Sequence, residues 1–346
     1  MTNNSVTLRD IANALKLSTS TVSKALRDSY EISDKTKRKV NSYAKKVGYQ
    51  PNTIAKSLKE GKSRSIGVVI CSIDNTFVSQ MLNGIDSACN ARGYSIMIMQ
   101  SKESHEQEKK CIELLQARSI DGLLVSPASE TTNVDHLKTF LHAGLPIVLF
   151  DRFNDELEVP KVSIDNLEAA YQATEHLIKN GYHRIALLHS NTLLNINIER
   201  LEGYEKALKQ HQITVNPDYI KPCDFQNSTT LQKSIVEAIE QLMALPAPPN
   251  AILTTSDQIS TQSVGIIRNL GYNIPEDIAL IGFTNTNLAS SLNPPLSTIY
   301  QPAIAIGEQA ALKLINMVEG KDDDPHQVIK LHTTLIERTS SKPKNF

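Results

Sequence analysis

Cysteine and long apolar runs are scarce in this chain of 346 residues. The four cysteines, Cys71, Cys89, Cys111 and Cys223, form no CxxC pair, which argues against a disulfide framework and against a structural zinc site. No apolar stretch approaches the roughly 18 to 20 residues of a membrane span, and the N-terminus MTNNSVTLRD lacks the basic-then-apolar pattern of a signal peptide. These absences predict buried free thiols and a cytoplasmic protein without a membrane partner.

Sequence motifs of the common enzyme classes are also absent. The chain has no GxSxG, no GxxxxGK phosphate loop, no HExxH and no GxGxxG after an apolar run. Its nine histidines are scattered, and the default role of a pair such as His183 and His189 is structural. Asp151 and Asp165 can do acid–base work, but nothing places a nucleophile between them. The sequence therefore predicts no catalytic residue, no metal and no cofactor, with a carbohydrate-acting α/β enzyme carrying a basic accessory domain as the alternative.

Charge is distributed unevenly along the chain, although the formal net charge is only −1. Residues 1–64 carry 14 Lys and Arg against 5 Asp and Glu, which leaves 22 against 32 for the remainder. The formal net charge is therefore +9 for residues 1–64 and −10 for the rest of the chain. A basic segment ahead of an acidic body is typical of a module that binds a polyanion.

Three short helical patterns fill the basic segment. Each begins with a hydroxyl residue that can cap a helix, and Gly48 ends the third pattern. Thr7 with Asp10 has the spacing of a capping box, and Ser18 and Ser33 are the other two expected caps. The expected apolar faces are Leu8, Ile11, Ala12 and Leu15, then Val22, Ala25 and Leu26, then Val40, Tyr43, Ala44 and Val47. Two helices joined by a short turn and braced by a third form the helix-turn-helix plan.

The run STSTVS at residues 18–23 places hydroxyl side chains on the outward face of the second helix. Ser and Thr are mediocre helix formers, so packing alone would not select this run. In a helix-turn-helix, the N-terminal part of the second helix enters the DNA major groove, where short hydroxyls reach base edges and phosphates. We therefore expect Thr19, Ser20, Ser23 and Lys24 to form a DNA-contact surface.

Residues 51–64 have the character of a linker. Pro51 interrupts the chain, Asn52 can cap, and residues 53–59 would form a helix of two turns, too short to be stable without a partner. Its basic residues and Leu58 suit a segment that orders on DNA and inserts an apolar wedge into the minor groove.

From residue 65 onward, short apolar runs alternate with amphipathic stretches that end in glycine. The runs are residues 65–70, 95–100, 122–126, 146–150, 184–190, 251–256 and 278–283. This alternation predicts parallel sheets covered on both faces, in two similar blocks of residues 65–164 and 165–290.

Polar residues follow the expected strands at their carboxyl ends, where ligands of open α/β sheets bind. Carboxylates, an arginine and an aromatic ring around one cleft suit a polyhydroxylated or heterocyclic small molecule. The residues found in this way are Asp74, Phe77, Ser126, Asp151, Arg152, Asp165, Asp257, Thr284 and Asn285.

Several segments together, VTLRDIANALKLSTSTVSKALRDS, TKRKV, GYQPN, IAKSLK and SRSIGVV, resemble the signature of the LacI/GalR family of bacterial transcription repressors. The resemblance extends from Val6 to about Thr339 and implies a homodimer that binds double-stranded DNA at a palindromic operator. Where the family usually has Ala-Gly in the turn, this chain has Leu15-Lys16, and a lysine in a left-handed position costs about 1 kcal/mol relative to glycine. The expected DNA-binding residues are Thr7, Arg9, Thr19, Ser20, Thr21, Ser23, Lys24, Tyr49, Asn52, Ala55, Leu58 and Lys59.

The body is similar to the effector domain of that family, itself related to periplasmic sugar-binding proteins. The resemblance implies an effector, a sugar or sugar derivative, bound between two subdomains. It adds Arg200, Phe225 and Gln301 to the strand-end residues, and it places Thr284 of GFTNT where the family often has an effector-binding aspartate. The full expected effector set is Asp74, Phe77, Ser126, Asp151, Arg152, Asp165, Arg200, Phe225, Asp257, Thr284 and Gln301.

The predicted fold is an N-terminal all-α helix-turn-helix headpiece followed by an α/β body of two doubly wound parallel-sheet subdomains, like a periplasmic binding protein. The headpiece spans residues 1–50 and the hinge helix and linker 51–64. The first subdomain comprises 65–164 and 295–325, and the second 165–294 and 326–341. Three crossings between subdomains form a hinge, through which an effector would control operator binding. No long heptad pattern follows residue 330, so no coiled-coil tail is expected.

Overall fold

The computed structural model describes residues 6–49, 62–192, 194–225, 227–322 and 324–343. The chain divides into two compact units between Ser63 and Arg64. The predicted short helix at 53–59 and the expected DNA contacts Asn52, Ala55, Leu58 and Lys59 lie outside the described residues. Within the described ranges, no helix has both the length and the apolar character needed to cross a bilayer.

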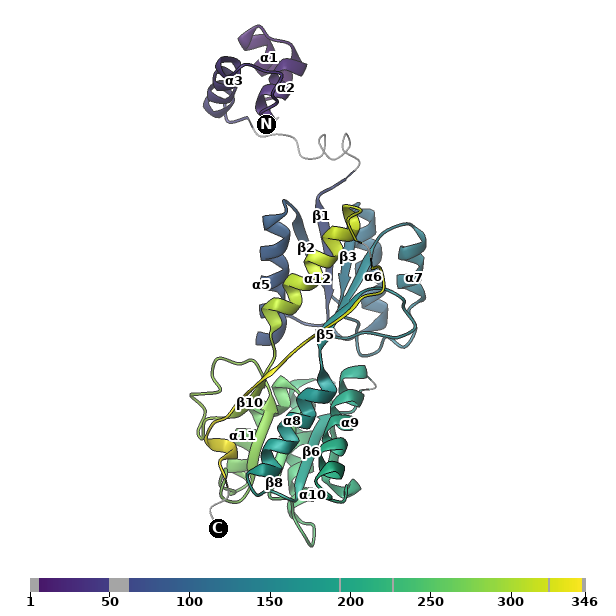
Figure 1. Ribbon diagram of the computed structural model, residues 1–346, viewed down its shortest axis with the longest axis vertical. Coiled ribbons are helices and arrows are strands. Elements are labelled where there is room, and N and C mark those ends of the chain that lie inside the picture. Colours follow the sequence, from purple (N-terminus) through teal and green to yellow (C-terminus); the bar gives the residue numbers. More distant parts are fainter. Residues whose placement is uncertain (1–5, 50–61, 193, 226, 323, 344–346) are drawn as a thin grey trace. The chain divides into compact units, whose positions relative to one another are not determined.

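Over residues 6–49, the first unit is a bundle of three helices, α1 (Leu8–Leu15), α2 (Thr19–Leu26) and α3 (Asp34–Lys46) (Figure 1). All three predicted caps are confirmed. Thr7 and Asp10 form a reciprocal capping box, Ser18 accepts a hydrogen bond from the Thr21 amide, and Ser33 accepts one from the Thr36 amide. Each cap satisfies a backbone donor that the first helical turn leaves unpaired.

The core of this unit is small and comes from one face of each helix, as predicted. Ile11, Val22, Ala25 and Val40 are fully buried, and Tyr49 packs against their cluster from beyond α3. Lys16, at the end of α1, lies in the left-handed region with φ 53°. The turn therefore keeps the geometry that a glycine would adopt without strain.

The second unit contains two sheets of six strands each. The first has the order β11-β5-β4-β3-β1-β2 and the second β12-β10-β9-β8-β6-β7. Every pairing is parallel except that of β10 with β12. The first sheet contains β1 (Ser65–Ile70), β2 (Ser95–Gln100), β3 (Gly122–Val125), β4 (Ile147–Phe150), β5 (Lys161–Ile164) and β11 (Val328–Leu331). The second contains β6 (Ile185–Ser190), β7 (Ile220–Cys223), β8 (Ala251–Thr254), β9 (Ala279–Phe283), β10 (Ser297–Tyr300) and β12 (Thr334–Ile336).

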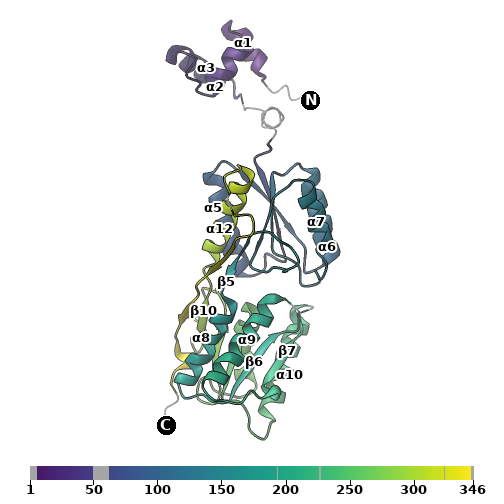
Figure 2. The same ribbon diagram turned by 45° about the vertical axis from the view of Figure 1, so that its right-hand side comes forward.

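Helices cover both faces of each sheet, so the prediction of two doubly wound subdomains is confirmed. On the first sheet, α5 (Thr76–Ala91) and α12 (Ala303–Val318) lie side by side on one face, and α6 (His105–Ala117) and α7 (Asp135–His142) lie on the other (Figures 1 and 2). On the second sheet, α8 (Asn166–Lys179) packs with α9 (Asn195–Gln210), and α10 (Ser228–Met243) packs with α11 (Asp257–Asn269). Short 3₁₀ turns occur at Pro217–Tyr219 and Thr339–Ser341. The four cysteines are free and buried, as predicted.

The structure corrects the predicted subdomain boundaries at residues 295 and 326. Strand β10, inside the segment assigned to the first subdomain, pairs with β9 of the second sheet, and β11 pairs with β5 of the first sheet. The chain therefore crosses between β5 and α8, between β10 and α12, and between β11 and β12. Two prolines precede β10, and this strand of four residues was not predicted. The segment QVIKLHTTLIER was predicted to be one last strand of the second subdomain, but it contains two strands, β11 in the first sheet and β12 in the second.

Candidate functional sites

The outward face of α2 carries the hydroxyl residues of STSTVS. Thr19, Ser20 and Lys24 are exposed, and Thr21 and Ser23 are half-buried. Ser18 organises the start of the helix, because its Oγ lies 2.8 Å from Ser20 Oγ and 2.7 Å from Thr21 Oγ1. The hydroxyls are thus presented at a helix N-terminus whose free amides favour an anion such as a phosphate.

The other expected DNA contacts of the first unit differ in their surroundings. Lys24 pairs with the Glu31 carboxylate, and Arg9 is exposed on α1. The Thr7 hydroxyl donates to Asp10 Oδ2 at 2.7 Å as part of the α1 cap. Tyr49 is half-buried against the three-helix core, and burial raises the pKa of its hydroxyl. Thr7 and Tyr49 therefore have structural roles in addition to any contact with DNA.

Arg200 is the centre of a polar network in the second unit. This arginine of α9 is only 4% exposed. Its Nε donates to Asn166 Oδ1 at 2.9 Å, its Nη2 donates to Gln301 Oε1 at 3.1 Å, and its Nη1 donates to the Thr255 carbonyl. The guanidinium lies 4.1 Å from the centroid of the Phe283 ring, which adds a cation–π contact. Burial lowers the pKa of Arg200 to about 10, and Asp151 opposes that effect.

Asp151 and Arg152 follow β4 on the first sheet. Arg152 Nη1 donates to both carboxylate oxygens of Glu103, at 3.0 and 2.8 Å. Glu103 Oε2 also accepts the Ser129 amide at 2.8 Å, which ties the loop after β3 to this pair. Asp151 adopts a left-handed backbone with φ 63°, and burial raises the pKa of its carboxyl. A strained, desolvated carboxylate beside two arginines is typical of a ligand site.

Asp257, at the start of α11, accepts a hydrogen bond from the Thr284 hydroxyl. Burial raises the pKa of the Asp257 carboxyl. The neighbouring Asn285 Nδ2 donates to Gln301 O at 2.7 Å and to Gln80 Oε1 at 2.8 Å. Because Gln80 belongs to α5, this second bond joins the two subdomains directly.

Several buried polar atoms in this region have no hydrogen-bond partner among the residues that the structure describes. Buried polar groups are normally paired, so a set of unpaired ones points to a bound polar molecule or to water. Two of these atoms belong to the first subdomain, in the segments that follow β3 and β4. Three belong to the second subdomain, in α8, in α9 and at the end of β8. They are Ser126 Oγ, Arg152 Nε, Asn166 Nδ2, Asn195 Nδ2 and Thr255 Oγ1.

The remaining expected effector residues lie at the strand ends without joining the Arg200 network. Asp74 is exposed and accepts from the Ser72 hydroxyl at 2.8 Å. Phe77 is buried in the first turn of α5, and Asp165 caps α8 by accepting the Glu168 amide at 3.0 Å. Phe225 is half-buried and packs on the core beneath α10 and α11. None of the described hydrogen bonds of Arg200 reaches these four side chains.

The structure also contains polar residues that the sequence reasoning missed. Asn166 and Thr255 each lie next to, or one position from, a residue that was singled out, in SIDN and TTSD. Attention to neighbouring positions would have found them. Glu103 and Asn195 carry no such signal, because their partners Arg152 and Phe153 are 49 and 42 residues away in sequence.

Two family models match the chain. Residues 63–339 match the model described as periplasmic binding proteins and sugar binding domain of the LacI family, and residues 7–52 match bacterial regulatory proteins, lacI family. Curated relatives include the HTH-type transcriptional repressor CytR of Escherichia coli K12, which is 34% identical over 91% of this chain and 90% of its own length. PurR of Vibrio atlanticus is 29% identical over 98% of this chain and 99% of its own length. These relatives are named as repressors and not as enzymes.

Solved structures share the fold. A structure of the lac repressor dimer bound to operator and the anti-inducer ONPF superposes with a TM-score of 0.85 at 23% identity, covering 98% of this chain and 100% of that one. The complex of the transcriptional regulator CelR with cellobiose gives a TM-score of 0.72 at 24% identity, covering 97% and 99%. At these identities the likeness establishes the architecture of the chain.

Proposed function

Because the chain belongs to the LacI family of bacterial regulatory proteins, we propose that it is a sequence-specific transcriptional repressor controlled by a small-molecule effector. The observation that carries this proposal is the exposed hydroxyl face at the N-terminus of α2, in a basic three-helix unit attached to a two-subdomain α/β body. Such a face suits the DNA major groove. A protein that regulates bacterial transcription acts in the cytoplasm.

DNA recognition is assigned to the first unit. Thr19 and Ser20 are the proposed base-reading residues, with Ser23, Lys24 and Arg9 beside them. Lys24 exchanges its bond to Glu31 for a phosphate or base contact. The lac repressor in the similar structure is a dimer on its operator, and we infer the same arrangement, two copies on a palindromic site, for this chain.

Effector recognition is assigned to the residues between the two sheets. The unpaired donors and acceptors around Arg200 and Arg152, together with the Asp151 and Asp257 carboxylates, support a ligand that makes many paired hydrogen bonds. A sugar or sugar derivative has this chemistry, and the similar CelR structure holds cellobiose. The Thr284 hydroxyl already donates its hydrogen bond to the Asp257 carboxylate. The Asp257 carboxylate is therefore the proposed hydrogen-bond acceptor for the ligand on that side.

The DNA-binding assignment is tested by matched alanine variants. Thr19→Ala and Ser20→Ala should each weaken binding to a selected palindromic site by about 5- to 150-fold, because a lost base contact costs about 1–3 kcal/mol. Binding to random DNA should hardly change. Ser42→Ala removes an exposed hydroxyl from α3 and serves as the control. Equal losses in all three variants, or none in any, would contradict the assignment of α2 to base reading.

A further inference from the structure

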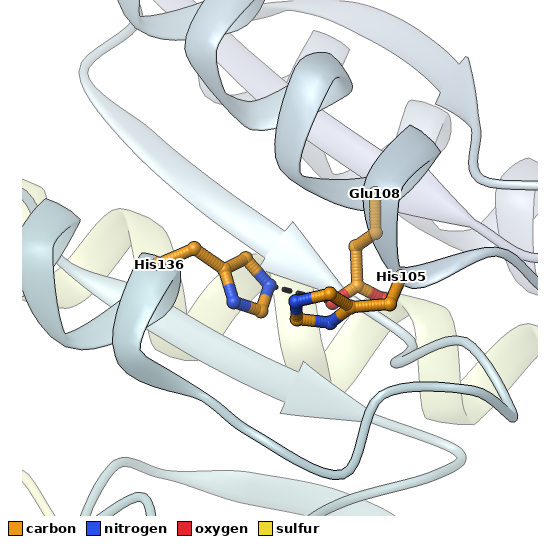
Figure 3. A group of neighbouring side chains, drawn as sticks. All are labelled: His105, Glu108 and His136. Carbon is orange, nitrogen blue, oxygen red and sulfur yellow. Dashed lines mark hydrogen bonds and ion pairs between the residues drawn. The ribbon is translucent and has the colours of Figure 1, made fainter.

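Three side chains outside both proposed binding sites converge between α6 and α7. His105 and Glu108 are three positions apart on α6, and therefore share a helix face, and His136 is on α7 (Figure 3). One potential ligand atom from each lies within 4.8 Å of the other two. His136 Nε2 lies 2.7 Å from Glu108 Oε1, and the rings of His105 and His136 meet edge to face at 4.9 Å between centroids.

Glu108 is the most unusual member of this group. It is a fully buried carboxylate, and within the described part of the chain its only ion-pair partner is His136. A buried charge is costly unless a countercharge or a metal compensates it. A compensating positive charge for Glu108 can come from the imidazole rings or from a bound cation.

Both histidines have a ring nitrogen that could bind such a cation. The Nδ1 atoms of both rings are buried, and no described residue forms a hydrogen bond with either of them. A buried ring nitrogen with no partner is an exception that a bound ion or a water molecule would explain. Residue His105 is only half-buried, so the group can be reached from solvent.

The supporting bonds around Glu108 resemble the outer shell of a metal site. Thr131 Oγ1 donates to Glu108 Oε1 at 3.1 Å, and the Ala128 amide donates to Oε2 at 2.6 Å. Outer hydrogen bonds of this kind orient a ligating carboxylate.

We propose that His105, Glu108 and His136 bind one divalent transition-metal ion of the Zn²⁺ class, with a nitrogen from each ring and a carboxylate oxygen as ligands. Two imidazoles and one carboxylate match the donor set of three-ligand zinc sites, which leave a further position for water or another ligand. Donors of a tetrahedral zinc site lie about 3.3 Å apart, so the present spacing requires side-chain shifts on the order of 1 Å.

The site is connected to the proposed effector residues through one loop. The Ala128 amide binds Glu108, the next amide, of Ser129, binds Glu103, and Glu103 holds Arg152. A bound ion would fix Glu108 and with it the loop after β3, which also carries the unpaired Ser126 hydroxyl. The metal site itself does not depend on the proposed function.

The test is zinc binding to the full-length, untagged, chelator-treated protein by calorimetry in the absence of DNA and sugar. The wild type should bind one equivalent. Loss of an outer hydrogen bond, such as that of Thr131, typically lowers metal affinity about 10- to 100-fold. His105→Ala and His136→Ala each remove a proposed ligand and should lower zinc affinity by more than this. His142→Ala, an exposed histidine at the end of the same α7, is the matched control and should bind like the wild type.

Two further measurements place the ion and guard against misfolded variants. Zn²⁺ should slow hydrogen exchange at the Ala128 amide in the wild type and in His142→Ala, but not in Glu108→Gln, which keeps the shape of the side chain. Bound Co²⁺ should show visible bands without a thiolate charge-transfer band, since no cysteine is a ligand. No stoichiometric binding by the wild type, undiminished binding by a folded His136→Ala variant, or a thiolate band would each overturn the proposal.

Discussion

Lys16 is a strained residue at the turn between the two helices of the helix-turn-helix. Its backbone is left-handed, with φ 53° and ψ 45°, and the residue is exposed. A residue with a Cβ in this region is destabilised by roughly 1–2 kcal/mol relative to glycine, although glycine also increases the entropy of the unfolded chain.

We expect Lys16→Gly to stabilise the first unit by up to about 1 kcal/mol. Lys16→Ala should leave its stability unchanged, because alanine has the same Cβ and only the charge is lost. Hydrogen exchange at the buried Ile11 and Val22 in the intact protein measures both effects. If Lys16→Ala also stabilised the unit, the lysine charge, and not backbone strain, would be the source of the destabilisation.

Asp257 gives a prediction about pH. Burial raises the pKa of its carboxyl above the ordinary 3.8, despite the hydrogen bond from Thr284. The folded protein therefore holds this proton more tightly than the unfolded chain does. The contribution of Asp257 to stability is then greatest below the ordinary pKa and falls as the pH rises through the raised value.

Asp257→Asn keeps an oxygen acceptor for Thr284 and removes the buried charge. Relative to the wild type, the free energy of unfolding of the variant should be higher at pH 7, and the difference should shrink as the pH falls toward 3.8. Urea unfolding over that pH range measures it. The opposite trend, with the largest gain in acid, would mean that the carboxylate is stabilised in the fold. The same variant should bind the effector more weakly, because an amide is a poorer acceptor than a carboxylate.

Helices α5 and α12 approach each other through two glycines. A Cβ on Gly84 would overlap the carbonyl oxygen of Ile304, and a Cβ on Gly307 would overlap that of Met81. The overlapping atoms are backbone, which cannot move aside without separating the helices. This contact holds the α12 segment, which returns from the second sheet, against the first sheet.

Gly84→Ala should therefore destabilise the second unit by about 1–3 kcal/mol or more, the usual range for overpacking. Gly265 in α11 has no atom within 4 Å of an added Cβ, so Gly265→Ala should instead stabilise by about 0.5–1 kcal/mol through helix propensity. Denaturant unfolding of both variants makes the comparison. Equal effects would mean that the helix crossing adapts to a methyl group.

The elements that the sequence predicted well are those with a strong local signal. The caps at Thr7, Ser18 and Ser33 and the seven apolar runs depend on short patterns, and all appear in the structure. Strands β5, β7 and β10 were not identified, because a proline precedes or interrupts each of them and polar residues break their short apolar runs. The ends of the strands predicted where a ligand would bind, but not which side chains meet there.

Contacts between distant segments account for the rest of what was missed. The bond between Asn285 and Gln80 spans 205 residues, and the group of His105, Glu108 and His136 depends on two helices packing on one face of a sheet. Because no spacing encodes such a meeting, the prediction of no metal did not anticipate this group.

The chain as a whole combines a basic unit for DNA with a body whose two subdomains are joined by three crossings and by the Asn285–Gln80 bond. In the proposed function, an effector that bridges Arg200 on one side and Asp151 on the other would change the energy of separating the subdomains. Allosteric coupling is typically about 1–3 kcal/mol, which corresponds to a change in operator affinity of about 5- to 150-fold.

The most direct test of this account is the affinity of the full-length protein for a selected palindromic DNA site, measured by fluorescence anisotropy at two salt concentrations with a panel of sugars and nucleobases. The account predicts tight binding that weakens with salt, and one ligand that shifts the affinity in the wild type but not in Arg200→Lys, which cannot make the three bonds of the arginine. Failure to select any sequence from a random pool would contradict the DNA-binding claim. A selected site whose affinity no ligand changes would contradict the effector claim.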